Sequence, residues 1–271
     1  MALTLMYITN NPIIAAIADR AKVDRVWIDL EQLYKEERQQ GLNTVKSKHK
    51  LEDIPIVKQV LHYSELQVRV NPINPNSKTE INRAIEYGAE ILMLPYFKTV
   101  TEVYQFLKYV DNRVKTVLLL ETKEAVAVLD DILKIRGIQE IHIGLNDLHL
   151  SYGMKFMFQL LADGTVDRLC QKIGEAGISY GFGGIAKLGE GMLPAEYVVA
   201  EHYRLHSKAA ILSRSFYDSV DETNYAEIER FFQASIAELR QYESELEKKS
   251  LEFFVENHKK VCEIVNQIIS R

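Results

Sequence analysis

Short apolar runs alternate along the chain with longer segments in which apolar residues recur at helical spacing. A run of this kind is typical of a strand buried on both faces, as in a parallel sheet. The runs occupy residues 3–9, 23–30, 66–70, 90–94, 116–120, 140–143, 178–185 and 208–213. Eight strands alternating with helices predict an α/β fold of the (β/α)8 TIM-barrel class. The alternative is a doubly wound open sheet, but that fold needs a glycine-rich nucleotide turn after an early strand, and the sequence has none.

Two carboxylates lie one strand–helix–strand period apart near the middle of the chain. Glu121 directly follows the strand predicted at 116–120. Asp147 lies in the loop expected after the strand at 140–143, just before a short helix, and a longer helix is predicted at 123–134. If the two strands are parallel neighbours, both carboxylates lie at the carboxyl-terminal edge of the sheet. Ligands bind at that edge in parallel α/β folds.

Two carboxylates that converge on one point repel each other unless a positive charge lies between them. A hard divalent cation fits this position, because Mg²⁺ takes one or two carboxylates together with water and substrate oxygens. Glu121 and Asp147 are therefore candidate metal ligands. The alternative is purely structural: Asp147 caps a helix, and Glu121 pairs with a nearby lysine or arginine.

Arg69 ends the third predicted strand and is the candidate anion-binding residue at the same edge. A buried arginine is costly unless it meets an anion, and its planar fork suits a carboxylate. The anion is either a substrate carboxylate or a protein carboxylate. Asp29 and Glu31, which follow the second strand, are the candidates for such an ion pair.

A glycine-rich turn follows the seventh predicted strand. Gly183 and Gly184 let backbone amides approach a bound anion, and Lys187 lies directly beyond them. Arg214 follows the eighth strand and is expected at the same edge. Loops in these positions of a barrel often bind phosphate, so this set is a candidate site for a distal carboxylate, phosphate or sugar hydroxyl. A tight glycine turn with no ligand is the alternative.

Residues 1–221 are expected to form the barrel, and residues 222–271 a long helical extension that completes it and packs on a neighbouring subunit. The net charge of −5 and the lack of a basic block argue against nucleic acid as a partner. No apolar run reaches the ~18–20 residues that cross a membrane, and no leader is recognisable. The two cysteines lie far apart in predicted helices, which suits a cytoplasmic protein.

Four blocks of this sequence resemble the HpcH/HpaI aldolase and citrate lyase family. They are VDRVWIDLEQ at residues 23–32, QVRVNP at 67–72, GAEILMLPYFKTVTEV at 88–103, and LLLETKEAVAVLDDILKIRGIQEIHIGLNDLHLSYG at 118–153. The blocks follow the family's order over most of residues 23–153. The resemblance implies that Glu121 and Asp147 hold a divalent metal, Mg²⁺ or Mn²⁺. It also implies that Arg69 binds the carboxylate and keto oxygen of pyruvate or oxaloacetate, and that subunits associate through the C-terminal helix.

One position departs from the family's pattern. Many metal-dependent members read I-D-x-E-H after the second strand, and the histidine is their candidate general base, whereas this chain has Gln32. A carboxamide does not titrate near neutral pH, which puts the aldol proton transfer in doubt. Glu31 matches the family's acid, and Asp29 is expected to orient the site or hold a water of the metal. His49 is the nearest titratable replacement by sequence, with a solvated loop histidine as the alternative.

These observations predict a metal-dependent carbon–carbon lyase, an aldolase that acts on a 2-oxo acid such as pyruvate or oxaloacetate with an aldehyde partner. Two alternatives remain. A citryl- or malyl-CoA-type acyl lyase would use the same arginine and acids with a thioester. A non-catalytic barrel would keep the metal site for binding alone, and Gln32 is the feature that favours it.

Overall fold

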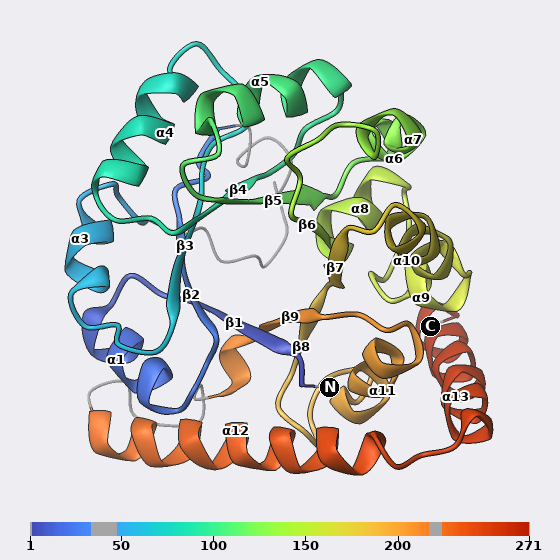
Figure 1. Ribbon diagram of the computed structural model, residues 1–271. Helices are drawn as coiled ribbons and strands as arrows, with labels where there is room; N and C mark the ends of the chain where they lie inside the picture. The colour runs from blue at the N-terminus through green and yellow to red at the C-terminus, as the bar shows by residue number, and fades with distance from the viewer. Residues whose placement is uncertain (1, 34–47, 217–223, 271) are drawn as a thin grey trace.

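One parallel sheet forms the centre of the computed structural model, which describes residues 2–33, 48–216 and 224–270 (Figure 1). Its order is β7-β6-β5-β4-β3-β2-β1-β9-β8. The strands are β1 (Thr4–Ile8), β2 (Arg25–Asp29), β3 (Glu65–Arg69), β4 (Ile91–Leu94), β5 (Lys115–Leu120), β6 (Glu140–Ile143), β7 (Ser179–Phe182), β8 (Gly184–Ile185) and β9 (Ala209–Leu212). The predicted TIM-barrel class is confirmed.

The barrel closes at Gly183, which separates β7 from β8. Its amide donates to the carbonyl of Ile143 in β6 (2.8 Å), and its carbonyl accepts from the amide of Ile211 in β9 (3.3 Å). The single strand predicted at 178–185 is therefore two short segments joined at a bend. Gly183 has a φ of +52°, a conformation that glycine adopts with little strain.

Helices form an outer ring around the strands (Figure 1). They are α1 (Pro12–Arg20), α3 (Asp53–Lys58), α4 (Ser77–Glu86), α5 (Val100–Val110), α6 (Lys123–Ala127), α7 (Leu129–Ile132), α8 (Leu145–Ser151), α9 (Gln159–Ala162), α10 (Thr165–Glu175), α11 (Ala195–Arg204), the 3-10 turn η1 (Arg214–Phe216), α12 (Tyr225–Leu246) and α13 (Leu251–Ile269). The helix predicted at 123–134 is broken at Val128, whose φ of −108° and ψ of 12° lie outside the helical region. The helix predicted after Asp147 begins earlier, at Leu145, so Asp147 is helical.

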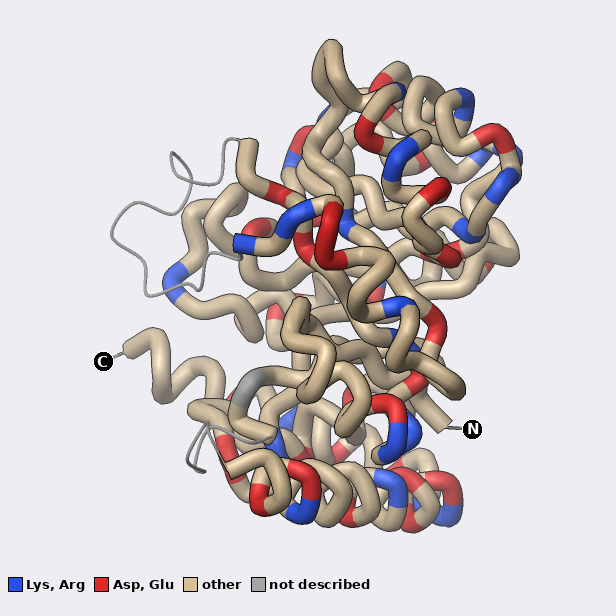
Figure 2. The backbone as a smooth tube through the Cα atoms, turned by 90° about the vertical axis from the view of Figure 1, so that its left-hand side faces the viewer, with Lys and Arg blue, Asp and Glu red and all other residues tan. Residues whose placement is uncertain are grey.

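Charged residues of both signs are scattered over the outside of the barrel. Figure 2 shows Lys and Arg interspersed with Asp and Glu along the helices in that view. Within the described residues, none of the helices combines the length and apolar character that a bilayer crossing requires.

The inside of the barrel is a packed core and not a channel. Trp27, Ile91, Met93, Val117 and Leu119 form an apolar cluster there, and each side chain is at most 2% exposed. The larger core lies between the outer face of the sheet and the helices. Because both faces of each strand are covered, the strands read as continuous apolar runs in the sequence.

An ion pair crosses the barrel at the amino-terminal ends of the strands. The guanidinium of Arg25 in β2 donates to both carboxylate oxygens of Glu140 in β6, at 2.9 and 2.8 Å. Four steps in the sheet order separate the two strands, so the pair spans the barrel interior. Both side chains are about nine-tenths buried. Removing one partner of such a pair leaves an uncompensated charge and costs about 3–5 kcal/mol of stability.

The two C-terminal helices pack on the barrel of their own chain. α12 contacts α1, and Phe232 packs edge-to-face on Tyr7 with ring centres 5.0 Å apart. α13 contacts α11 and α9. Asn257 and His258 of α13 both bind the carboxylate of Glu201, which is fully buried in α11, at 2.9 Å. The extension therefore covers one side of the barrel (Figure 1).

Candidate active site

Arg69 and Asp29 form a buried ion pair at the carboxyl-terminal edge of the sheet. The two residues are register partners on β3 and β2. Nε and Nη2 of Arg69 donate to the two carboxylate oxygens of Asp29, each at 2.8 Å. Asp29 is 1% exposed, and the guanidinium carbon lies 5.0 Å from the ring centre of Trp27, one layer deeper in the barrel. The ion pair that the sequence allowed between Arg69 and a protein carboxylate is therefore present.

A second carboxylate lies beside the same guanidinium. Oε2 of Glu31 is 3.4 Å from Nη2 of Arg69, and the Glu31 amide donates to the Asp29 carboxylate at 3.2 Å. Burial disfavours the charged guanidinium, but the charges of Asp29, Glu31 and Glu121 outweigh burial and raise the pKa of Arg69 above its usual value. Arg69 is therefore a cation at neutral pH.

The carboxylate of Glu121 is held directly beyond β5. Its Oε1 accepts a hydrogen bond from the backbone amide of Tyr96 at 2.9 Å, and the residue is 4% exposed. Tyr96 adopts a φ of +48°, which is uncommon for a residue with a side chain. On the other side, a Cβ on Gly144 would lie 2.9 Å from both Cβ and Oε2 of Glu121. Gly144 therefore leaves space for this carboxylate, and the Tyr96 backbone donates a hydrogen bond to it.

Asp147 lies on the neighbouring element, in the first turn of α8, and is partly exposed. The register of β5 on β6 pairs Leu120 with Ile143, so Glu121 lies level with Gly144 and Asp147 follows three residues later. Glu121 and Asp147 thus follow neighbouring strands at the same edge of the sheet. Across the described parts of the chain, His, Cys, Asp and Glu side chains form no group of three that would hold a metal unaided.

This donor set fits a hard divalent cation that keeps water or substrate oxygens among its ligands. Mg²⁺ is commonly bound by one or two carboxylates in that way, so a third protein ligand is not required. Glu121 and Asp147 are the two residues that would supply the carboxylates.

The sequence matches the model of a known family as well. The model described as HpcH/HpaI aldolase/citrate lyase matches residues 3–157, which include all of these strand ends. The chain belongs to the HpcH/HpaI aldolase/citrate lyase family. No curated protein sequence matches it.

Several solved structures have the same fold. An HpcH/HpaI aldolase from Desulfitobacterium hafniense DCB-2 superposes with a TM-score of 0.60 at 14% identity, over 78% of this chain and 86% of that one. The citrate synthase SbnG gives 0.60 at 14% identity, over 90% and 95%. Macrophomate synthase gives 0.57 at 15% identity, over 90% and 85%. Identities this low show a shared architecture and not a shared substrate.

Gln32, the residue at which the sequence pattern departs from that of the resembled family, lies next to His49. The Gln32 side chain is exposed and donates to the His49 carbonyl at 3.4 Å. The ring of His49 accepts a hydrogen bond at Nδ1 from the Asp29 amide at 3.0 Å. The structure therefore places His49 beside the acidic residues, although it lies 17 residues beyond Gln32. Part of the intervening loop, residues 34–47, lies outside the described residues.

Asn71 is a site residue that the sequence analysis did not single out. Its Oδ1 accepts from the amides of Gln32 and Leu33 at 2.9 and 3.0 Å. Its own side-chain amide donates to Glu80 at 2.8 Å. Asn71 thus joins the turn after β2 to the turn after β3. Its place two residues beyond Arg69, at a strand's carboxyl end, was the available signal.

The residues of the candidate distal site lie after β7 and β9. A Cβ on Gly183 would lie 2.7 Å from Cδ1 of Leu145, so the glycine turn packs closely on α8. The ammonium of Lys187 lies 4.2 Å from the ring centre of Phe231 in α12, and its backbone amide donates to Ser215. Arg214 begins η1, but its side chain lies outside the described part of the structure.

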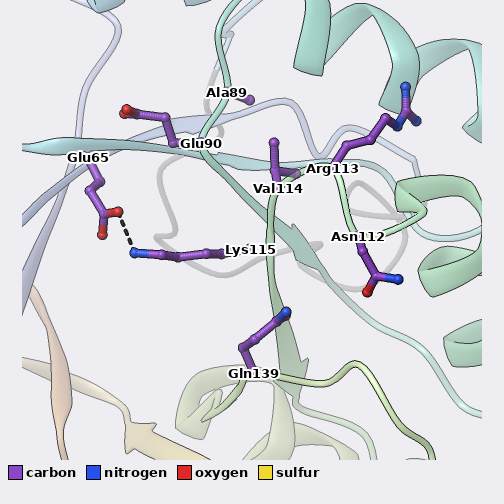
Figure 3. A pocket seen from close by; sticks show the side chains of 8 residues that line it. All are labelled: Glu65, Ala89, Glu90, Asn112, Arg113, Val114, Lys115 and Gln139. Atoms are coloured by element: carbon purple, nitrogen blue, oxygen red, sulfur yellow. Dashed lines mark hydrogen bonds and ion pairs between the residues drawn. The ribbon is translucent and has the colours of Figure 1, made fainter.

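A shallow depression of about 470 Å³ opens at the opposite end of the barrel (Figure 3). Its lining comes from the amino-terminal ends of β3 to β6: Glu65, Ala89, Glu90, Asn112, Arg113, Val114, Lys115 and Gln139. Glu65 and Lys115 form an ion pair there, at 2.5 Å. In TIM barrels this end serves stability and the chemistry lies at the carboxyl-terminal end, so the depression is not the candidate active site.

Proposed function

We propose that this HpcH/HpaI family member is a metal-dependent carbon–carbon lyase that acts on a 2-oxo acid such as pyruvate or oxaloacetate, with an aldehyde as the second partner. The observation that carries the proposal is the environment of Arg69. The charged guanidinium of Arg69 lies at the barrel mouth and contacts the carboxylates of Asp29 and Glu31. The negative charge of Glu121 also raises its pKa. A 2-oxo acid has the carboxylate and the adjacent oxygen that such a group recognises.

Glu121 and Asp147 are the residues proposed to hold Mg²⁺ or Mn²⁺. When bound, the metal would act as a Lewis acid toward the carbonyl of the 2-oxo acid. The chain's contribution is to keep Glu121 in place through the Tyr96 amide and the space beside Gly144. A ligand locked in this way needs no rearrangement when the substrate arrives.

Arg69 is proposed to bind the substrate carboxylate and to share the negative charge that develops on the enolate when the carbon–carbon bond breaks. Fixed donors aimed at a developing charge often contribute more to catalysis than any other single effect. Asp29 holds two of the guanidinium nitrogens, so it orients the group and leaves the remaining donors for the substrate. Glu31 corresponds to the family's acid and lies 3.4 Å from the same group.

Gln32 bears on which reaction is favoured. Aldol cleavage needs a base to take the proton of a hydroxyl group, and a carboxamide does not serve as one. Decarboxylation of oxaloacetate breaks a carbon–carbon bond, releases CO₂ and leaves the same enolate without that proton transfer. The proposed enzyme is therefore expected to decarboxylate oxaloacetate more readily than it cleaves aldols.

Gly183, Gly184, Lys187 and Arg214 are proposed to contact the distal end of the substrate, where a carboxylate, phosphate or hydroxyl group would lie. Supporting this are their positions after β7 and β9, where barrels often bind such groups. Lys187 would have to leave the face of Phe231 to take part. A cation–π contact at a partly exposed site contributes only about 0.5–1 kcal/mol, so a substrate anion can offset its loss.

A homo-oligomer in the cytoplasm is part of the same proposal. Leu251 and Val255 lie one turn apart on α13 and are 74% and 49% exposed. Exposed apolar residues at this spacing suit a contact with a second copy of the chain. Light scattering should show an assembly in the wild type, and Leu251→Glu together with Val255→Glu should reduce its mass.

Two other functions make different predictions in one assay. The protein is incubated with Mn²⁺ or Mg²⁺ and, separately, with oxaloacetate, with pyruvate plus aldehydes, and with citryl- or malyl-type CoA esters. Turnover of the 2-oxo acid that disappears with a chelator and in Glu121→Gln supports the proposal. Turnover of the thioesters alone identifies an acyl lyase. Metal binding without any turnover identifies a non-catalytic barrel, the outcome that Gln32 favours.

A further inference from the structure

His49 contacts the acidic turn after β2 at two points. Nδ1 of its ring accepts the backbone amide of Asp29 at 3.0 Å. Its backbone carbonyl accepts the side-chain amide of Gln32 at 3.4 Å. The turn between these points carries the carboxylates of Asp29 and Glu31, which are both 1% exposed and both contact Arg69. His49 therefore contacts both ends of the segment that orients the guanidinium.

The backbone amide of Asp29 lies beyond the end of β1, so no carbonyl of that strand is there to accept its hydrogen bond. Alternate amides of a strand point to opposite neighbours, and the Leu30 amide bonds to the Arg69 carbonyl in β3 at 2.9 Å. The Asp29 amide therefore points toward β1. That strand ends at Ile8, the register partner of Trp27. A buried amide is seldom left without an acceptor, and the His49 ring occupies the position that the next carbonyl of β1 would have had.

This contact determines where the ring proton is. A backbone amide only donates, so Nδ1 must offer its lone pair and is unprotonated. In the neutral ring the proton then lies on Nε2, which cannot accept another. Taking a proton at Nδ1 would break the bond to Asp29.

We propose that His49 is a positioning residue, which caps β2 with Nδ1 and holds the Asp29–Gln32 turn against Arg69, and that it is not the proton acceptor of the reaction. The activity arm of the test rests on the proposed lyase function, whereas the structural arm does not.

Three substitutions separate the possible roles of the ring. His49→Asn places an acceptor oxygen where Nδ1 was and removes Nε2. His49→Gln places its amide where Nε2 was and removes the Nδ1 acceptor, and His49→Ala removes both. For a capping role, both oxaloacetate decarboxylation and aldol cleavage in the asparagine variant should stay within about threefold of wild type. The glutamine and alanine variants should lose about tenfold or more in kcat, because a displaced turn misplaces Arg69.

A base at Nε2 gives a different result. All three variants then lose aldol cleavage to a similar degree, since none titrates near neutral pH, and a limb near the ordinary histidine pKa of ~6.5 disappears from the pH profile of that reaction. If the ring instead acts as a hydrogen-bond donor through Nε2, only His49→Gln should retain turnover. Either result overturns the capping role.

A measurement on the wild-type protein tests the contact without any turnover. In protein labelled with ¹⁵N at histidine, the His49 Nδ1 signal should be that of an unprotonated, hydrogen-bonded nitrogen. The Asp29 amide should exchange slowly with solvent in wild type and His49→Asn, and quickly in the other two variants. A proton on Nδ1, or an Asp29 amide unaffected by His49→Ala, overturns the inference even if no lyase substrate is found. If these signals are as expected but no 2-oxo acid turns over, the lyase proposal has failed and the cap stands.

Discussion

The guanidinium of Arg69 and the carboxylate of Asp29 face each other across neighbouring strands, with two nitrogen–oxygen contacts of 2.8 Å. Both side chains are largely buried, at 13% and 1% exposure. Such a pair orients the arginine and occupies only some of its donors, because a guanidinium has five N–H groups and one carboxylate accepts fewer than five. The pair is thus compatible with a second anion at the same group.

Arg69→Lys should reduce the turnover of a 2-oxo acid by about 10²-fold or more, because an ammonium keeps the charge but loses the fork that binds Asp29 and the substrate together. Affinity for Mn²⁺ should change little. Steady-state kinetics and calorimetric titration measure the two quantities. Arg83→Lys is the matched control, at a residue of α4 whose side chain is 42% exposed. Unchanged kinetics in Arg69→Lys would show that the residue is structural only.

Glu121→Gln and Asp147→Asn should each abolish or strongly weaken Mn²⁺ binding, since each removes one of two anionic ligands. Circular dichroism should remain that of the wild type, because the changes are nearly isosteric. Glu124→Gln, on a residue of α6 near Glu121 in sequence, serves as the control. A titration in which either of the two main variants binds Mn²⁺ as the wild type does rules out the two-carboxylate site.

Gly144→Ala tests the space that Glu121 occupies. The added methyl group would lie 2.9 Å from Glu121 Cβ and Oε2, and 3.2 Å from Leu119, closer than van der Waals contact allows. Glu121 must then move, so Mn²⁺ affinity should fall about tenfold or more while the barrel stays folded. Gly174→Ala, in the last turn of α10, is the matched change away from the site and should leave affinity unaltered. Equal affinities in both variants would contradict the close fit.

Gln32→His should raise aldol cleavage with little effect on oxaloacetate decarboxylation, because it places a titratable group at the position where the pattern of the resembled family has a histidine. The ratio of the two rates, measured on one preparation, is the readout. Gln59→His, at the end of α3, controls for adding a histidine elsewhere. Vigorous aldol activity in the wild type, with no gain in Gln32→His, would indicate that another group, such as Glu31, accepts the proton.

The stability of the protein should fall as the pH drops below neutrality, partly through two buried histidines. Burial lowers the pKa of His142 to about 4, and burial together with His142 lowers that of His202 to about 3. In the unfolded chain both titrate near ~6.5. As the pH falls below 6.5, these two histidines become protonated in the unfolded state but stay neutral in the folded state. Each histidine should then lower the free energy of unfolding by about 1 kcal/mol per pH unit between pH 6.5 and its folded pKa. Above pH 6.5 it should have no effect on the free energy of unfolding.

Urea unfolding at pH 7, 6 and 5 measures this loss. His142→Gln should show a shallower decline of the unfolding free energy than the wild type, because one of the two buried groups no longer titrates. His62→Gln, at an exposed histidine, should retain the wild-type slope. Identical slopes in His142→Gln and wild type would mean that His142 takes up its proton over the same pH range in the folded and unfolded states, and would contradict the lowered pKa.

Local sequence pattern is enough to predict the barrel and the edge at which its polar residues meet. A parallel sheet covered on both faces demands continuous apolar runs, so the strands and their order were readable from such runs. Arg69, Asp29 and Glu121 end or follow these runs, which places them at one end of the barrel. The length of the runs did not reveal the bend at Gly183, since both halves of that strand are apolar enough to read as one.

Contacts between distant segments follow from the folded arrangement and not from local pattern. His49 reaches the Asp29 amide because β2 continues beyond Trp27, the register partner of the last residue of β1, and no local pattern records that offset. The Glu121 carboxylate is held by the Tyr96 amide, after β4, and occupies the space that a side chain at Gly144, after β6, would fill. Lys187 lies on Phe231, 44 residues away, because α12 packs across the barrel there. Hydrogen bonds and close packing depend on ångström-scale distances between elements, and such distances exist only once the chain has folded.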